Sequence, residues 1–501
     1  LNFFAGPTDK NFKAEFNFFN VHYAYTHIVG TCGGNTNDAK IATDTETTAP
    51  DTWETEPAET ELHDDLPDDL DFDGTEIGIC SSQHVAFNGN LDVAEYDENT
   101  SALDQAIYDR NRNVEERLNV KIHEYLSAIG ADDAGKVFTN SVTAGDDAYT
   151  ILHQADRTVF SFGLKGYMLD LNRDMPYIDL TKPYWQQDGN AVLGLMGKQY
   201  GAFTELSLRP YDYTHLLVFN QDLIREYSLA NPHDYWRNND WTFDRFEELI
   251  TAVHVDLDGN GKFDKNDLYG YHDRKGFLYP LMYTAAGLKT VIEDEAGRPV
   301  FNMPGNEAFQ TIYDWCDRVF YKEEAYYKQD AGNDFFVKHP MFQEGKALFS
   351  DMTFFYVGMM RDMLSDFGII VFPKYTAEQD RYYSWVEGGA GCIGVAVTCQ
   401  EKEAVGAALE ALSCASMRDV IPIYYENNLK AKYSRDEIST QMFDEIQASR
   451  SFDLGDTIWC EQIRDYFGPV FFNHQPLASA IAKKQESFGK TLEDTIAALS
   501  D

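Results

Sequence analysis

From Thr75 onward, short apolar runs alternate with amphipathic stretches, and this order restricts the possible folds more than any other feature of the sequence. EIGICSS at 76–82 and VKIHEYL at 120–126 have the composition of buried strands. The stretch between them has apolar residues near helical spacing, at Leu103, Ile107, Val114 and Leu118. DDAYTILHQ then predicts another strand. Strands that alternate with helices form mainly parallel sheets, so we expect an α/β fold.

Length and charge set further limits. A chain of 501 residues is too long for one hydrophobic core and predicts two or more lobes. Its 83 acidic residues exceed its 41 Lys and Arg residues, giving a formal charge of −42, which argues against a nucleic-acid partner. The same charge argues against attachment to anionic lipid by charge alone. The 14% of aromatic residues leave room for a ligand with apolar faces and hydroxyl groups, as sugars have.

The first 74 residues predict an anchored chain. Residues 1–32 form a degenerate signal region, in which VGTCGGN at 29–35 resembles the cleavage box of bacterial lipoproteins. We therefore expect lipidation of Cys32, with a free or buried thiol as the alternative. Residues 33–74 are rich in Thr, Glu, Asp and Pro, a composition typical of a disordered acidic tether. This order predicts an extracellular protein held to the outer face of a bacterial cell membrane through a lipid anchor.

The stretch DLDGNGKFDKND at 256–267 has the spacing of an EF-hand calcium loop. Its expected oxygen donors are Asp256, Asp258, Asn260, the carbonyl of Lys262, Asp264 and Asp267. The alternative is a solvated acidic turn without an ion. Asp267 stands where Glu is usual, so we expect modest affinity. A calcium sensor also needs an opening helix pair and usually a second loop, so this single loop predicts a structural calcium ion.

Several stretches along the body resemble one family in the expected order. They are RNRNVEERLNVKI, LKGYMLDLN, HLLVFNQDLIREYSLANP, DWTFDRFEELI, FQEGKALFSDMTFFYVGMM, IIVFPK and GGAGCIGVAVTCQEKEAVGAALEAL. The chain thereby resembles the extracellular solute-binding proteins of ABC importers, in the sugar-binding branch. The resemblance implies an α/β, two-lobed periplasmic-binding-protein type II fold with hinge crossovers, in which each lobe is a sheet flanked by helices.

The resemblance also implies a division of the body and a function. Lobe 1 is expected to comprise residues 75–207 and 351–388. Lobe 2 is expected to comprise 208–350 and 389–501, with the calcium loop at 256–267 and C-terminal helices at 401–501. A carbohydrate, either an oligosaccharide or a sugar derivative, would be captured between the closing lobes and delivered to the membrane permease by a monomeric protein without enzymatic activity.

Matching the sequence to the family pattern places candidate ligand residues at strand ends and crossovers. They are Ser81, Ser82, Gln154, Asp156, Trp185, Glu205, Tyr211, Phe354, Phe355, Tyr356, Trp385 and Glu387. Flat aromatic faces with carboxylates and amides suit the apolar patches and hydroxyl rim of a sugar ring. For any single aromatic residue, core packing is the competing interpretation.

The sequence offers three other interpretations. Gly389, Gly391 and Gly394 spell GxGxxG, but the β-branched run that follows them does not predict the helix N-terminus that a dinucleotide site needs. Glu205 and Glu387 could form the carboxylate pair of a secreted glycoside hydrolase. A calcium-stabilised surface adhesin or scaffold module would also keep the tether and the loop, but it would not require the alternating crossovers.

Overall fold

A computed structural model describes residues 62–82, 90–95, 97, 100–127, 133–272, 276–327, 340–357, 360, 363–426 and 437–500. These residues belong to one compact unit of the chain, with bounds Glu61–Asp501. The predicted signal region at 1–32, Cys32 and most of the predicted tether lie outside the described residues.

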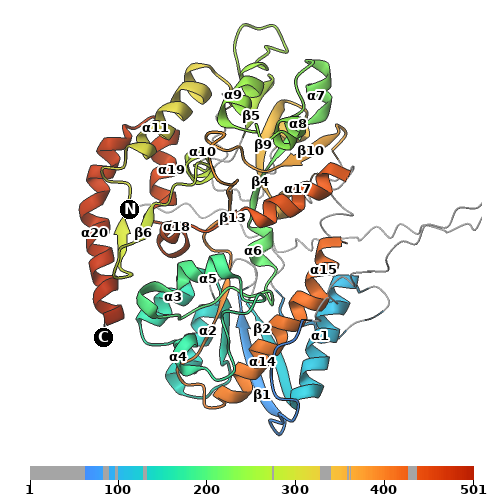
Figure 1. The fold of residues 1–501 in the computed structure, drawn as a ribbon, viewed down its shortest axis with the longest axis vertical. Helices are drawn as coiled ribbons and strands as arrows, with labels where there is room; N and C mark the ends of the chain where they lie inside the picture. Colours follow the sequence, from blue (N-terminus) through green and yellow to red (C-terminus); the bar gives the residue numbers. More distant parts are fainter. Residues whose placement is uncertain are drawn as a thin grey trace, which may run out of the picture. The chain divides into compact units, whose positions relative to one another are not determined.

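The first sheet has the strand order β12-β3-β1-β2. Its strands are β1 (Thr75–Ser81), β2 (Val120–Leu126), β3 (Ile151–Gln154) and β12 (Cys392–Val395). β1 is parallel to β2 and β3, whereas β12 runs antiparallel to β3. Figure 1 shows helices flanking this sheet. They include α1 (Ala102–Leu118), α2 (Asp133–Ala144), α3 (Asp156–Leu164), α4 (Leu171–Asp174), α5 (Gln187–Leu193) and α14 (Lys402–Ala415).

Local sequence sets the bounds of α1. The Ser101 hydroxyl accepts a hydrogen bond from the backbone N–H of Asp104 at 3.1 Å and so caps the first turn. The helix ends at Asn119, which has a left-handed backbone with φ of 50°. The next residue begins β2, so the predicted strand–helix–strand order is confirmed here.

The second sheet has the order β10-β4-β9-β5-β8. Its strands are β4 (His215–Asn220), β5 (Tyr269–His272), β8 (Tyr326–Tyr327), β9 (Ala347–Thr353) and β10 (Phe367–Ile370). β4 is antiparallel to both neighbours, while β5 is parallel to β8 and β9. All six residues of β4 are buried, as expected for a strand inside a covered sheet.

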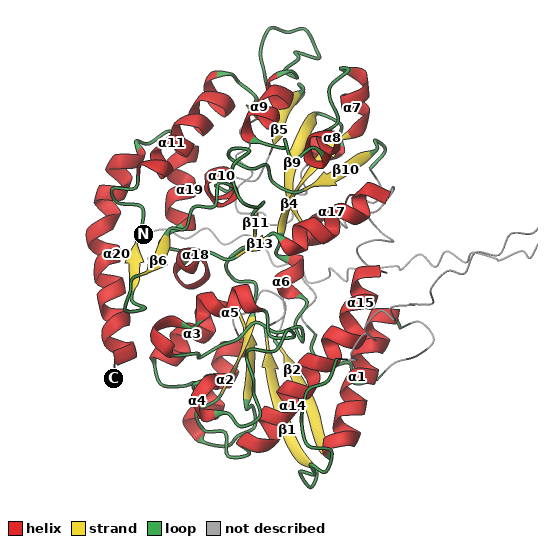
Figure 2. Cartoon of the chain, viewed as in Figure 1, coloured by secondary structure: helices red, strands yellow, loops and turns green. Residues whose placement is uncertain are grey.

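Figure 2 shows helices around the second sheet as well. They include α7 (Gln221–Glu226), α8 (Pro232–Arg237), α9 (Phe243–Thr251), α10 (Leu278–Ala285), α11 (Glu307–Cys316), α17 (Glu437–Ala448) and α19 (Arg464–Phe472). Two further helices are α12 (Pro340–Gln343), next to β9 in the chain, and α20 (Leu477–Ser500). Two sheets, each flanked by helices, confirm the predicted α/β fold class. A hairpin of β6 (Val291–Glu293) and β7 (Pro299–Phe301) contacts α20 through the rings of Phe301 and Phe488, whose centroids are 5.1 Å apart.

Within the described residues, two segments connect strands of the two sheets near the strand ends. The first connection includes α6 (Arg209–Asp212) and leads into β4. The second follows β11 (Ser384–Trp385), which pairs with β13 (Arg450–Ser451), and leads into β12. The two connections pair with each other at Thr214 and Val386. We call residues 205–214 the first crossing and 386–391 the second crossing.

The predicted assignment of residues to lobes is wrong for three strands. Residues 351–353 of β9 and all of β10 fall in the stretch assigned to lobe 1, yet both strands pair with β4 in the second sheet. β12 was assigned to lobe 2, yet it pairs with β3 in the first sheet. Periodicity predicts a strand but not the neighbour to which its backbone hydrogen-bonds, and that neighbour decides the lobe.

The prediction that the last part of the tether, residues 62–74, is disordered is also wrong. Residues 62–74 lie against the first sheet's core, where Leu66 is buried and Leu62, Leu70 and Phe72 pack beside it. Asp64 forms an ion pair with Arg117 at 2.6 Å. The regularly spaced apolar residues in this acidic stretch bury enough surface to offset part of its ordering entropy.

Candidate functional site

The end of β3 and the two crossings meet at one buried point. Asp156, the residue that opens α3 just after β3, accepts the backbone N–H of Gly389 at 2.9 Å and 3.1 Å from its two oxygens. Glu387 of the second crossing donates its backbone N–H to the carbonyl of Tyr213 in the first crossing at 3.2 Å. The predicted residues Asp156 and Glu387 are therefore brought into one region, which we call the junction.

Glycines let the crossing backbone approach its neighbours closely. Gly389 and Gly391 have φ of +104° and +90°, a region that favours glycine. A Cβ on Gly388 would lie 2.2 Å from the carbonyl oxygen of Asp456. Gly394 lies inside β12, and a strand rather than a helix holds it, so the GxGxxG run is not a dinucleotide site.

His215 lies between two carboxylates at the junction. Its Nδ1 is 3.3 Å from Asp351 and its Nε2 is 3.5 Å from Glu387. Trp385 stacks on the imidazole, with ring centroids 4.7 Å apart and an interplanar angle of 13°. The predicted pair of Trp385 and Glu387 thus shares one neighbour, and Trp385 itself is only 2% exposed.

The C-terminal segment completes the junction with a buried charge network. Asp456 of α18 (Leu454–Trp459) accepts the indole N–H of Trp385 at 3.0 Å and the backbone N–H of Gly388 at 2.6 Å. Arg464 of α19 pairs with Glu387 at 3.1 Å and with Asp456 at 3.6 Å. Burial raises the pKa of Asp456 to about 6, although Arg464 opposes the shift. Buried charges of both signs compensate one another here.

Asp156 has a raised pKa as well. Complete burial raises the pKa of Asp156 to about 7, against the opposing effects of Arg157 and the N–H of Gly389. An acid that titrates near neutral pH, beside a cation and at a crossing between two sheets, is typical of a functional site.

A pocket of about 350 Å³ opens next to Asp156. Its lining residues are Arg157, Thr158, Ser161 and Phe162 of α3, and Ile458, Trp459, Cys460, Glu461 and Gln462 at the end of α18. The wall therefore combines one guanidinium, one carboxylate, hydroxyl groups, an amide and aromatic rings. This combination can bind a polar solute that has apolar faces.

Two further groups of predicted residues lie at the ends of the first crossing. Tyr211 donates its hydroxyl to Glu205, and the guanidinium of Arg450 lies 4.6 Å from the centre of the Tyr211 ring. Ser82 accepts the Nη1–H of Arg209 on its hydroxyl at 3.0 Å.

The remaining first-sheet candidates lie near these strand ends. Gln154 uses its side-chain oxygen to accept the neighbouring N–H of Ala155 at 2.8 Å. Ser81 is fully buried at the end of β1.

Four predicted aromatic residues belong to packed regions. Trp185 is fully buried in the first sheet's core, where its indole N–H donates to Glu410 of α14 at 2.9 Å. Phe354, Phe355 and Tyr356 form α13 (Phe354–Val357), in which Phe354 stacks on Phe443 at 5.4 Å and Tyr356 is buried. Trp185 and Phe354 are therefore core residues, as the competing interpretation of these aromatic residues expects.

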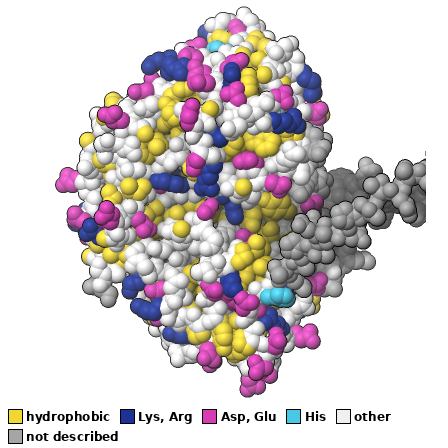
Figure 3. Space-filling model, viewed as in Figure 1, with side chains coloured by type: hydrophobic (Ala, Val, Ile, Leu, Met, Phe, Trp, Pro, Cys, Tyr) yellow, Lys and Arg dark blue, Asp and Glu magenta, His cyan; other side chains and the backbone are white. Residues whose placement is uncertain are grey.

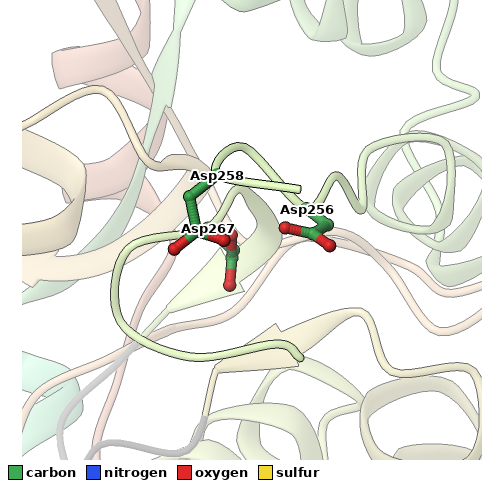
Figure 4. A group of neighbouring side chains, drawn as sticks. All are labelled: Asp256, Asp258 and Asp267. Carbon is green, nitrogen blue, oxygen red and sulfur yellow. The ribbon is translucent and has the colours of Figure 1, made fainter. Parts of the chain in front are cut away.

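The acidic loop at 256–267 brings three carboxylates together (Figure 4). Ligand oxygens of Asp256, Asp258 and Asp267 all lie within 4.8 Å of one another. Asp256 accepts the backbone N–H groups of Gly259 and Gly261 at 2.7 Å each, so the loop curls around this side chain. Asp267 is fully buried and accepts from Leu257 at 2.9 Å. Clustered carboxylate oxygens in a curled loop fit a hard cation such as calcium.

The other predicted donors of the loop are engaged with its backbone. Asn260 accepts the N–H of Lys262 at 2.8 Å, and Asp264 accepts the N–H of Asn266 at 2.8 Å. The Asp264 carboxylate does not belong to the group of three carboxylates.

Sequence reasoning missed the positively charged residues and the histidine of the site. Arg157 directly follows the predicted Asp156, and His215 is the one ionisable residue in the apolar strand HLLVFN. Both signals were present in the sequence. Asp456 and Arg464 had no such signal, because their partners are about 70 residues away in the chain.

No family model matches the chain. Solved structures do resemble it. The cyclic α-maltosyl-1,6-maltose binding protein of Arthrobacter globiformis is 14% identical, with a TM-score of 0.56, covering 84% of this chain and 100% of its own. An ABC substrate-binding protein of Listeria monocytogenes in complex with cycloalternan is 16% identical, with a TM-score of 0.52 and the same coverage. A solute-binding protein of Thermotoga lettingae bound to α-D-tagatose has a TM-score of 0.51 at 15% identity, covering 84% of this chain and 100% of its own. The chain has the fold of ABC-transporter solute-binding proteins.

Short segments of the chain also match curated proteins of other kinds. The uncharacterised protein YggP of Escherichia coli is 74% identical over 42 residues, and the L-sorbose 1-phosphate reductase of Klebsiella pneumoniae is 67% identical over 42 residues. Each match covers 8% of this chain, and the chain spans about a tenth of the length of these relatives. A segment of that size is far below the length of a domain, so it carries no argument for the whole chain.

Proposed function

We propose that this protein is the extracellular substrate-binding component of an ABC importer, which captures a carbohydrate between its two lobes and delivers it to the membrane permease. The observation that carries the proposal is the junction. There, the end of β3, both crossings and the C-terminal segment meet through Asp156, Gly389 and Asp456, beside a polar pocket with aromatic walls. Closure of two lobes about such a junction lets a transporter recognise the loaded form.

The pocket and the solved structures of similar fold support a carbohydrate ligand. The Arthrobacter, Listeria and Thermotoga proteins are described with carbohydrate ligands. In the pocket, Arg157, Ser161 and Gln462 can donate to sugar hydroxyls, and Trp459 offers an aromatic surface. On the face shown in Figure 3, several Lys and Arg side chains gather near the middle, whereas acidic side chains are scattered over it.

Calorimetry with the full chain tests this proposal. Maltotetraose, cyclic maltosyl-maltose and tagatose are the probes, and chromatography follows their fate. We expect one of them to bind without turnover. Arg157→Ala should weaken binding at least tenfold and should also lower the melting temperature, because it removes the cation beside the buried Asp156. Arg298→Ala, at a surface ion pair with Asp294, is the matched control. Normal affinity in Arg157→Ala would place the ligand elsewhere, and consumption of a probe would favour the hydrolase.

A glycoside hydrolase is the alternative that the geometry supports less. Glu205 is fully buried and is held by Tyr211, with Arg450 nearby. Glu387 is paired with Arg464 and lies beside His215. Each carboxylate belongs to its own network, whereas a glycosidase needs two carboxylates that both face the scissile bond. The binding role therefore fits these residues better.

The calcium ion and the anchor are further parts of the proposal. A calcium ion held by Asp256, Asp258 and Asp267 would serve structure, since the loop precedes β5 and lies outside both crossings. Lipidation at Cys32 would hold the protein to the outer face of the cell membrane. No helix in the described part of the chain is long and apolar enough to cross a membrane.

The anchor has its own test. Cell fractionation with mass spectrometry of the N-terminus should find a diacylated cysteine at position 32 and membrane-bound protein, while Cys32→Ser should be released. Detection of unmodified residues before position 32 in the mature protein would reject the anchor. Light scattering tests the predicted monomer.

A further inference from the structure

The imidazole of His215 has acidic partners on two sides. Asp351 of β9 faces Nδ1 at 3.3 Å, and Glu387 of the second crossing faces Nε2 at 3.5 Å. His215 itself begins β4, directly after the first crossing. The side chain therefore lies where both crossings meet the second sheet, and it is 1% exposed.

The protonation state of this ring decides how many of these contacts are favourable. A neutral imidazole has one N–H and can donate to one carboxylate, while its other nitrogen presents a lone pair to the second. An imidazolium donates from both nitrogens. Two carboxylates on opposite sides of one buried ring are therefore matched only by the charged form.

The surrounding groups reinforce this preference. Glu387 also pairs with Arg464 of α19, which in turn pairs with Asp456 of α18. The faces of the ring are covered by Trp385, at 4.7 Å, and Phe277, at 5.8 Å. An imidazolium stacked on an indole gains a favourable cation–π interaction.

The balance of effects on the pKa agrees with the geometry. Burial by itself lowers the pKa of His215, but Asp351 and Glu387 outweigh it and the pKa is raised above its ordinary value. Stability from this group is then fully present below the ordinary histidine pKa and is lost as the pH rises through the raised value.

We propose that His215 is a positioning residue whose imidazolium ties the second crossing to the second sheet, so that ligand affinity falls as the pH rises and the ring loses its proton. The first part concerns the junction alone. The second part rests on the proposed function, because it assumes that the closed form binds a ligand. Opening of the lobes would separate the Glu387 carboxylate from His215 or reorient that carboxylate. The open and closed forms would then bind the imidazole proton with different affinity.

The first experiment needs no ligand. In the full chain labelled with [13C-ε1]histidine, the His215 resonance is identified by its loss in His215→Gln. We expect it to titrate above pH 6.5, and Asp351→Asn to lower its pKa. A His215 resonance that titrates at or below pH 6.5 would overturn the proposal.

The second experiment measures affinity for maltotetraose from pH 5.5 to 8.5. We expect affinity to fall with rising pH, about tenfold if the closed and open forms differ by one pKa unit. His215→Gln should flatten this dependence. This variant keeps Asp156 and Asp456, which titrate in the same pH range. Any pH dependence that remains in the variant is therefore assigned to these two acids. An unchanged pH profile in His215→Gln would refute the link to binding.

A matched control is His233→Gln. His233 is equally buried, but its Nε2 faces the carbonyl of Ile369 at 2.7 Å, and Phe219 packs edge-on against its ring. We expect this variant to lose stability and to keep the wild-type pH profile of binding. If maltotetraose does not bind at all, the resonance titration still decides the first part, so failure of the proposed function is distinguishable from failure of the tie.

Discussion

Replacing Trp185 with Phe should test whether this residue supports the core or contacts the ligand. The indole is fully buried and donates to Glu410 at 2.9 Å, and the neighbouring Tyr184 donates to the other oxygen of Glu410 at 2.6 Å. Phe keeps an aromatic ring but removes the N–H. A hydrogen bond to a charged group contributes about 1.5–3 kcal/mol, and the smaller ring adds a cavity cost of about 1 kcal/mol.

The expected loss is therefore about 2–4 kcal/mol in the free energy of unfolding. For a unit of about 440 residues, the unfolding entropy is about 0.9 kcal/mol per kelvin near 60 °C, so the melting temperature should fall by about 2–4 °C. Burial already raises the pKa of Glu410, and losing a donor raises it further. Because stability is lost as the pH rises toward this raised pKa, the destabilisation should be larger at pH 8 than at pH 5.

The assay combines calorimetric unfolding with ligand titration of the same sample. Trp315→Phe is the matched control, since Trp315 also donates to a carboxylate, Glu247, at 2.9 Å, but at a partly exposed site where Arg318 remains bound to that carboxylate. We expect the control to lose less than about 1 kcal/mol. A Trp185→Phe protein with normal melting but at least tenfold weaker ligand affinity would refute this reasoning and restore Trp185 to the ligand site.

Two other perturbations give distinct outcomes. Because the pKa of Asp156 is raised to about 7, the free energy of unfolding of the wild-type protein should fall as the pH rises from about 4 to 7. Urea denaturation at several pH values should show a weaker pH dependence in Asp156→Asn. An equal pH dependence in the two proteins would contradict the burial argument. Chelation of calcium should lower the melting temperature by about 3 °C relative to free calcium at 100 times its dissociation constant, which corresponds to about 2.7 kcal/mol, and should leave ligand specificity unchanged. Asp258→Asn should remove this response while the exposed control Glu295→Gln keeps it; a wild-type protein whose melting ignores calcium would argue for a solvated acidic turn.

The elements of the fold follow from local sequence to a large extent. VKIHEYL predicts β2 with its observed bounds, and the helical spacing after Ser101 predicts α1. These signals are local, because side-chain period and capping residues act within a few positions. Sheet membership is not local. β9 and β12 have ordinary strand patterns, and only pairing with β4 and β3 assigns them to a sheet.

In the candidate site, too, the sequence predicts local features but not long-range contacts. The sequence could place Asp156, Trp385 and Glu387 in one region, because strand ends and crossings lie at the same edge of the sheets in α/β proteins; their role toward a ligand stays a prediction. Their partners could not be placed. The hydrogen bond from Gly389 to Asp156 joins residues 233 positions apart, and no period or motif in the sequence relates them.

The long-range contacts also explain why the junction contains so many charges. Its acids lie on four separate segments, at the start of α3, in β9, in the second crossing and in α18. The backbone N–H of Gly389 donates to Asp156, and that of Gly388 donates to Asp456. Apolar side chains would hold these segments together in any register, whereas a carboxylate that accepts a particular N–H fixes one. The same contacts become costly if the segments move apart without water replacing them. Under the proposed function, in which the lobes close on a ligand and reopen, that combination would make the closed form well defined and leave the open form solvated.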